Sequence, residues 1–180
     1  MIVIDDPNIL QNDFVNLLEG TKTHSLQALG LLGENAKKLN GDEFETVVYK
    51  NTLKASQNSP FEGHVFQTGP HAFPDIIARK YFGMEVKMTT GDKWVSTGNS
   101  ILETTRVNDV ERIYMFFGKF GGNFDVKYRL YQDCLCDVGV THSPRYKIDM
   151  NLANGHSIFN KIGVKVAQIS INSIIFRSKP

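Results

Sequence analysis

An alternating segment between Phe73 and Thr89, FPDIIARKYFGMEVKMT, constrains the fold of this chain more than any other feature. Apolar residues precede a basic turn around Lys80, and after the turn apolar residues alternate with charged ones, a pattern typical of strands. Folding the segment as an antiparallel hairpin centred near Lys80 places Asp75 opposite Glu85. Lys87 follows on the same side, because side chains alternate between the two faces of a sheet. The sequence therefore predicts two carboxylates and an ammonium on one face.

The length and composition favour one globular domain. A chain of 180 residues with 41% hydrophobic residues is large enough to bury a substantial core. No apolar run reaches the roughly 18 residues of a membrane span, and the start of the chain lacks the features of a secretion signal. Cys134 and Cys136 are the only cysteines, too few to build a zinc site alone. We expect a reduced, cytoplasmic protein with no membrane partner.

The net charge of +1 excludes an overall basic protein, but the charges are unevenly distributed. Residues 1–110 carry 10 Lys and Arg against 14 Asp and Glu, a balance of −4. Residues 111–180 carry 10 against 5, a balance of +5. Such a basic half is suited to a phosphate backbone, and ordinary surface lysines explain it equally well.

Helices are predicted on both sides of the hairpin. Two helical pieces within residues 5–40, ending at Gly20 and Gly33, form an N-terminal cover. A further helix opens at Gly41, with Asp42 as its N-cap. After a polar loop over residues 89–99, the S-x-x-E pattern that starts at Ser100 predicts a helix to about Val110.

Strands complete the predicted sheet. Residues 63–67 form a strand before the hairpin, and residues 112–117 and 124–131 form two strands after it. A helical crossover over residues 100–110 makes strand 112–117 parallel to the second hairpin strand. Residues 145–150 and 165–176 are expected to be strands, with a loop around Asn154-Gly155 between them. The predicted class is α/β, a central mixed β-sheet flanked by helices.

The Pro74-Asp75 pair, followed after nine residues by Glu85-Val86-Lys87, resembles the signature of the PD-(D/E)XK nuclease superfamily. The predicted element order resembles the αβββαβ core of that superfamily, and among its members the chain is most similar to a type II restriction endonuclease. The resemblance covers about residues 40–132. It implies a single nuclease domain over residues 1–180, in which residues 1–40 are a helical cover and residues 133–180 are an extension that contacts DNA or dimerises.

Two alternatives bear on this motif. A second D-x-K triplet, Asp125-Val126-Lys127, has no Pro-Asp pair before it and does not complete the signature. A purely structural ion pair on the sheet is the other interpretation of Asp75, Glu85 and Lys87. Against it, a buried ion pair often costs more free energy than it returns.

The resemblance also implies a role for each residue of the motif. Asp75, Glu85 and the main-chain carbonyl of Val86 are implied ligands of one or two Mg²⁺ ions. Lys87 is implied to orient the attacking water and to neutralise charge on the phosphate. Glu45 is a candidate outer-shell carboxylate, with a solvated first-turn acid as the alternative interpretation.

Hydrogen-bond donors and cations after the hairpin are candidate DNA contacts, with an ordinary capped loop as the alternative. They are Lys93, Ser96, Thr97, Asn99, Ser100, Arg106 and Lys119. The implied function is Mg²⁺-dependent, sequence-specific hydrolysis of double-stranded DNA by a homodimer, with a cognate DNA methyltransferase in the same system. Two other functions remain open: a repair or recombination nuclease such as a junction resolvase, and a non-catalytic nucleic-acid-binding module on the same fold.

Overall fold

The predicted hairpin is present and lies inside a mixed sheet. A computed structural model describes residues 10–101, 106–140 and 143–163 of the chain. In it, β2 (Ile76–Ala78) and β3 (Phe82–Thr89) pair antiparallel, joined by a turn in which Arg79 and Lys80 both have positive φ. Ile77 lies opposite Gly83. Continuing this register by two residues places Asp75 opposite Glu85, as the sequence predicts.

Three more strands complete this five-stranded sheet, whose order is β1-β2-β3-β5-β6. They are β1 (Val65–Gln67), β5 (Arg112–Lys119) and β6 (Asp125–Leu130), all close to the predicted positions. β3 and β5 pair parallel, with Glu85 beside Met115 and Lys87 beside Phe117, and the other pairs are antiparallel. The prediction of a parallel crossover is therefore confirmed.

The predicted crossover helix over residues 100–110 is wrong for the residues that the structure describes. Ser100 ends strand β4 (Val95–Ser100), and Arg106 forms an isolated parallel bridge with Phe73. Residues 102–105, and with them the Glu103 of the predicted capping box, lie outside the described residues. The segment VSTGNS pairs with a strand almost fifty residues later in the chain, and this long-range pairing overrides the local helix signal.

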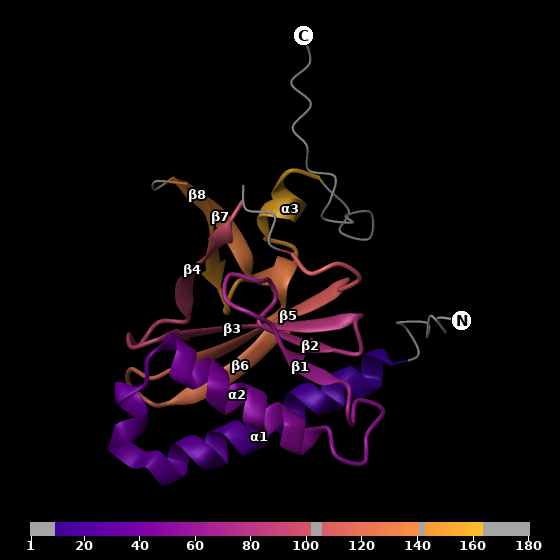
Figure 1. Cartoon of the computed structure of the whole chain (residues 1–180). Helices are drawn as coiled ribbons and strands as arrows, with labels where there is room; N and C mark the ends of the chain where they lie inside the picture. Colours follow the sequence, from indigo (N-terminus) through magenta and orange to yellow (C-terminus); the bar gives the residue numbers. More distant parts are fainter. Residues whose placement is uncertain (1–9, 102–105, 141–142, 164–180) are drawn as a thin grey trace, which may run out of the picture.

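Two long helices cover one face of the five-stranded sheet (Figure 1). α1 (Gln11–Leu32) is continuous and leads into a short 3₁₀ helix, η1 (Gly33–Lys38). The prediction that the first helical piece ends at Gly20 is wrong. A Cβ at Gly20 would lie 3.1 Å from the Cβ of Ala55, so this glycine serves the close approach of α1 to α2 (Gly41–Ala55). Gly33 does end the helix, with φ of 54°.

The N-cap of α2 lies two residues earlier in the chain than expected. Asn40, not Asp42, is the N-cap: its side chain accepts a hydrogen bond from the Glu43 N–H at 2.9 Å. The Glu43 carboxylate in turn accepts the Asn40 N–H at 2.8 Å, which completes a capping box. Asn40 is the N-cap because the oxygen of its side-chain amide reaches the third residue of the helix, whose N–H has no acceptor within the helix.

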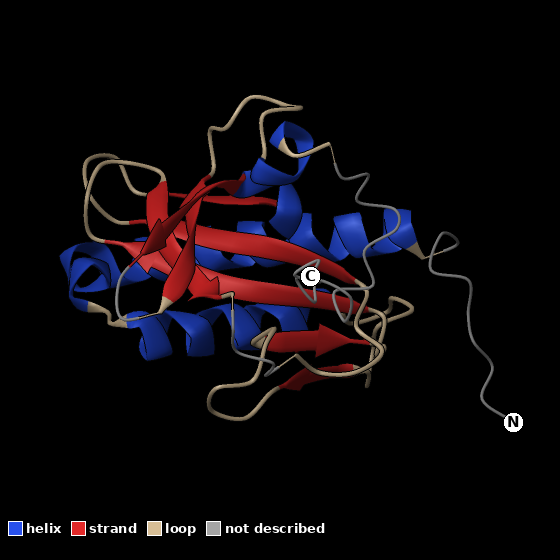
Figure 2. Ribbon diagram, turned by 90° about the horizontal axis from the view of Figure 1, so that it is seen from above, coloured by secondary structure: helices blue, strands red, loops and turns tan. Residues whose placement is uncertain are grey.

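A second sheet packs against one part of the opposite face, where the sequence predicts helices (Figures 1 and 2). Its order is β4-β8-β7, and it is formed with β7 (Leu135–Val140) and β8 (Pro144–Asp149). A 3₁₀ helix, η2 (Tyr131–Cys134), leads into it, and a short helix, α3 (Ile158–Lys161), follows it. The strand predicted at 145–150 and the turn at Asn154-Gly155 are confirmed, and β7 was not predicted. The strand predicted at 165–176 lies outside the described residues.

The molecule is therefore an α/β protein with a mixed five-stranded sheet, but its two long helices, α1 and α2, lie on one side of that sheet, and the other side packs against the second sheet and the short α3. This differs from the predicted arrangement of a sheet flanked by helices. The helical side contains several aromatic residues, among them Phe14, Phe44, Phe82 and Phe116, all fully buried. The other side packs Met115 and Phe117 against Ile148 and Met150 of the second sheet region. Glu85 and Lys87 belong to this second side.

Candidate active site

Asp75, Glu85 and Lys87 are brought together at the end of the hairpin that lies opposite its turn. The Lys87 ammonium lies 2.8 Å from Oε1 of Glu85. Oδ2 of Asp75 accepts the main-chain N–H of Val86 at 2.7 Å, so the Asp75 carboxyl group lies at the edge of β3. β2 begins only at Ile76, and Asp75 therefore takes the place of a strand partner there. The predicted cluster is confirmed as a geometric feature.

Strand alternation explains why these polar groups share one face. On β3, Phe82, Met84 and Val86 point to the helical side and are buried there. The intervening side chains of Glu85 and Lys87 point to the other side. Glu85 is only 2% exposed, whereas the Lys87 side chain is 29% exposed and Asp75 is half-buried. The cluster thus lies at a boundary between the core and solvent.

Burial is the main cause of the raised pKa values of both carboxyl groups. Burial raises the pKa of Asp75 to about 8, and the neighbouring Glu85 adds to this rise. Burial also raises the pKa of Glu85, although the contact with Lys87 opposes it. For Lys87, burial lowers the pKa, but attraction to Glu85 and Asp75 outweighs this and raises it overall. Asp75 therefore holds a proton at neutral pH unless another cation takes its place.

The donor set fits a small divalent cation. Oε2 of Glu85 is buried and makes no hydrogen bond with the described residues. The Val86 carbonyl points to the same edge as its N–H, toward Asp75, because both groups of a strand residue face the same neighbour. The described residues contain no cluster of three Asp, Glu, His or Cys side chains. Two carboxylates and a carbonyl, completed by water and phosphate oxygens, match the preference of Mg²⁺.

Glu45 lies near this cluster but is held by another residue. Its Oε1 accepts a hydrogen bond from the Gln67 side chain at 2.8 Å. Its charge is close enough to raise the pKa of both Asp75 and Lys87. Helix α2 and the edge strand β1 thus add a half-buried carboxylate and an amide at the rim of the site. Gln67 was not predicted, since nothing in its local sequence distinguishes it.

The second sheet supplies the opposite wall of the site. The Asn99 side chain, from β4, lies near the Glu85 carboxyl group and lowers its pKa. The main chain of Asn99 also lies near Tyr131, which is 6% exposed and close to Glu85. Asn99 was predicted as a DNA contact, and in the structure it contacts Glu85. Tyr131 was not predicted, because its proximity depends on the packing of the two sheets.

The other candidate DNA contacts are distributed over different environments. Lys93 and Thr97 are exposed and Ser96 is half-buried, so these three stay predictions. Ser100 is buried at the end of β4 and does not start a helix, and its DNA contact stays a prediction. Lys119 is 7% exposed and is paired with Asp92 and with the Gly121 carbonyl, which corrects its prediction as a phosphate contact.

Arg106 has a structural contact of its own. Its guanidinium donates a hydrogen bond to the Val110 carbonyl, and burial lowers its pKa. Its Nη1 is buried without a hydrogen-bond partner among the described residues. The contact with Val110 closes the chain segment that enters β5. The Arg106 side chain thus has a structural role through its hydrogen bond to Val110, and its contact with DNA stays a prediction.

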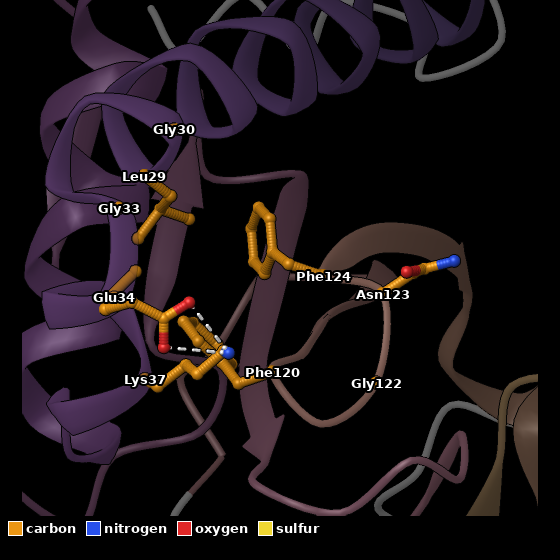
Figure 3. A pocket seen from close by; sticks show the side chains of 10 residues that line it. Leu29, Gly30, Gly33, Glu34, Lys37, Phe120, Gly122, Asn123 and Phe124 are labelled. Carbon is orange, nitrogen blue, oxygen red and sulfur yellow. Dashed lines mark hydrogen bonds and ion pairs between the residues drawn. The ribbon is translucent and has the colours of Figure 1, made fainter.

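A hollow of about 280 Å³ lies away from this cluster, between the end of α1 and the β5–β6 turn (Figure 3). Leu29, Phe120 and Phe124 line it, and an ion pair between Glu34 and Lys37, 2.9 Å long, stands at one side. The hollow contains none of the carboxylates described above. The cluster of Asp75, Glu85 and Lys87 is therefore not part of this hollow.

None of the helices in the described part of the chain combines the length and the apolar character needed to cross a membrane. Comparisons of the chain with protein-family models, with curated proteins and with solved structures found no match.

Proposed function

We propose that this protein is a Mg²⁺-dependent endonuclease that hydrolyses phosphodiester bonds of double-stranded DNA. The observation that carries the proposal is the hairpin cluster itself. Two carboxyl groups with raised pKa values lie together at the edge of β3, one oxygen of Glu85 has no partner, and a lysine lies within 2.8 Å. A structural ion pair needs one acid and one base, and does not account for a second, half-buried carboxyl group beside them.

Each residue has a distinct role in this proposal. Asp75, Glu85 and the Val86 carbonyl would hold the cation, which when bound polarises the phosphate and lowers the pKa of water. Lys87 keeps its positive charge at neutral pH, since its pKa is raised, and its partial exposure lets it meet a phosphate oxygen. Asn99 holds the orientation of Glu85 from the second sheet. Glu45, tied to Gln67, adds negative charge at the rim.

The finer assignment is a site-specific type II restriction enzyme that acts as a homodimer. Two strands of a duplex require two active sites, and a palindromic sequence matches a two-fold symmetric dimer. The short signature at Pro74-Asp75 and Glu85-Val86-Lys87 supports the nuclease proposal but carries no sequence specificity. A cognate DNA methyltransferase is expected in the same system.

Incubation of the purified protein with unmethylated phage DNA and Mg²⁺ tests the proposal. We expect discrete fragments with Mg²⁺, none with a chelator, and none from the Asp75→Ala variant. The matched control is Lys54→Ala, which removes an exposed charge on α2 and should cleave like the original protein. Cleavage that persists in Asp75→Ala overturns the metal assignment.

Other outcomes of the same assay distinguish the alternatives. Cleavage confined to branched or damaged DNA would identify a repair or recombination nuclease. DNA binding without cleavage under any divalent cation would identify a binding module. Light scattering with and without duplex DNA measures the expected dimer, and a monomer that cleaves both strands contradicts the symmetric arrangement.

A further inference from the structure

We propose that Lys127 binds a backbone phosphate of the DNA strand that enters the hairpin site, beside the phosphate that is cleaved. This inference rests on the proposed function and extends it to a second contact. Lys127 belongs to the second D-x-K triplet of the chain, which lacks the partners of a catalytic site. Its position in the sheet gives it a different use.

The strand register places Lys127 on the same face as the hairpin cluster. Lys87 lies beside Phe117 in the parallel pair β3–β5, and Phe117 lies opposite Lys127 in the antiparallel pair β5–β6. The three residues therefore form a row across the sheet on the side of Glu85. Two strand spacings separate the backbones of the two lysines by about 10 Å. A single DNA strand spans that separation within a few nucleotides.

An aromatic platform holds the Lys127 ammonium in place. The ammonium lies 4.3 Å from the ring centroid of Trp94, and Trp94 packs on Phe117 with ring centroids 5.9 Å apart. A cation over the face of an indole ring is attracted by the ring quadrupole. The ammonium also donates a 2.7 Å hydrogen bond to the side chain of Asn151, in a solvent-exposed position. Its position is thus fixed before any ligand arrives.

The charge of Lys127 is not neutralised. Within residues 10–101, 106–140 and 143–163 it forms no ion pair. The Lys119 ammonium lies 5.8 Å from the ring centroid of Trp94, but Lys119 is paired with Asp92 and is buried. Two lysines approach one tryptophan, and only Lys127 is half-exposed and free of a carboxylate. A half-exposed cation fixed in this way is suited to an anionic oxygen.

Lys127 could instead serve to anchor the turn that contains Asn151. Measurements of DNA binding distinguish this structural role from a contact with phosphate. Trp94 is the only tryptophan of the chain, so its fluorescence reports directly on this site. Mixed-sequence duplex DNA is titrated into the Asp75→Asn protein, which prevents cleavage, at salt concentrations between 50 and 200 mM. The same titration is made with Lys127→Gln and Lys127→Arg on that background, and with Lys54→Gln as the matched surface control.

We expect DNA to change the Trp94 emission. Lys127→Gln should lower the salt dependence of the DNA-binding constant by the equivalent of about one released counterion. A slope smaller by about 0.9 corresponds to roughly a threefold smaller loss of affinity across this fourfold range of salt. Lys127→Arg should keep the slope, and Lys54→Gln should not change it. An unchanged slope in Lys127→Gln, in protein that still binds DNA, overturns the inference alone. Absence of DNA binding by the parent protein overturns the proposed function as well.

Discussion

The two faces of the five-stranded sheet differ in what they bury, although the same strands form both. The helical face is closed: α1 and α2 bury side chains such as Phe82, Met84 and Phe116 completely. A second sheet packs against part of the opposite face, and at the end of β3 this face holds two carboxyl groups and a lysine. One face therefore supplies stability, and the other holds charges whose burial costs free energy. Their separation lets one strand serve both the core and a site.

The largest expected difference between the two faces is in stability and cleavage, when one residue of the core and one residue of the site are substituted separately. Phe116→Ala should lower the free energy of unfolding by about 3–5 kcal/mol, because it leaves a cavity on the helical face. Glu85→Gln should lower it by a smaller amount, about 1–2 kcal/mol, because it weakens the contact with Lys87 but removes a buried charge, and it should lower DNA cleavage at least about 100-fold. Urea unfolding and cleavage rates measure the two effects. A Glu85→Gln protein as unstable as Phe116→Ala would make Glu85 a structural residue.

The pH dependence of stability sharpens the contrast. The pKa of Asp75 is raised from its ordinary 3.8 to about 8, so the folded state binds a proton that the unfolded state releases. Its contribution to stability is full below about pH 4 and is lost as pH rises through about 8. Metal-free protein should therefore melt at lower temperature at pH 9 than at pH 6, and Asp75→Asn should remove most of this difference.

Mg²⁺ should reverse that loss, because it binds the deprotonated carboxylates. At 100 times its dissociation constant it adds about 2.7 kcal/mol, which raises the melting temperature by about 5–10 °C at pH 9. The rise should be smaller at pH 6, and Asp75→Asn should show none. An equal rise at both pH values, or in the variant, would locate the bound cation elsewhere.

Two glycines of the central strands allow a matched comparison. A Cβ at Gly118 would lie 2.6 Å from the Phe44 ring on the helical face, and one at Gly83 would lie 2.3 Å from the Pro74 ring on the other face. Each change to alanine should cost about 1–3 kcal/mol in unfolding experiments. Only Gly83→Ala should weaken Mg²⁺ binding, because Pro74 directly precedes Asp75. Equal loss of Mg²⁺ binding in both variants would show that global stability alone controls the site.

The smallest expected effect is a change in Mg²⁺ affinity when Asn99, on β4 of the second sheet, is substituted. Asn99→Ala removes the polar side chain that lies near Glu85 and lowers its pKa, and should weaken Mg²⁺ binding about tenfold. Thr97→Ala, at an exposed position of the same strand, is the control and should bind Mg²⁺ normally. Isothermal calorimetry measures both. Normal affinity in Asn99→Ala would limit the role of β4 to covering the sheet.

Local pattern predicted the parts of the molecule that neighbouring residues control. The alternation between Phe73 and Thr89 fixes the hairpin, its register and the face that carries Glu85 and Lys87, because the strand period is two. The helix at Gly41 and the strands β5 and β6 follow from equally local signals. The carboxylate–carboxylate–lysine cluster is therefore contained in the sequence.

The tertiary structure decided everything that depends on distant partners. The segment at Ser100 carries a helix-capping pattern, yet it is a strand because β8 offers it a row of backbone partners. The same pairing places Asn99 against Glu85 and removes the predicted crossover helix. Gly20 looks like a helix end, and the approach of Ala55 turns it into a contact point within α1. Local sequence sets backbone preferences of about 1 kcal/mol, which the burial of whole sheets and helices readily outweighs.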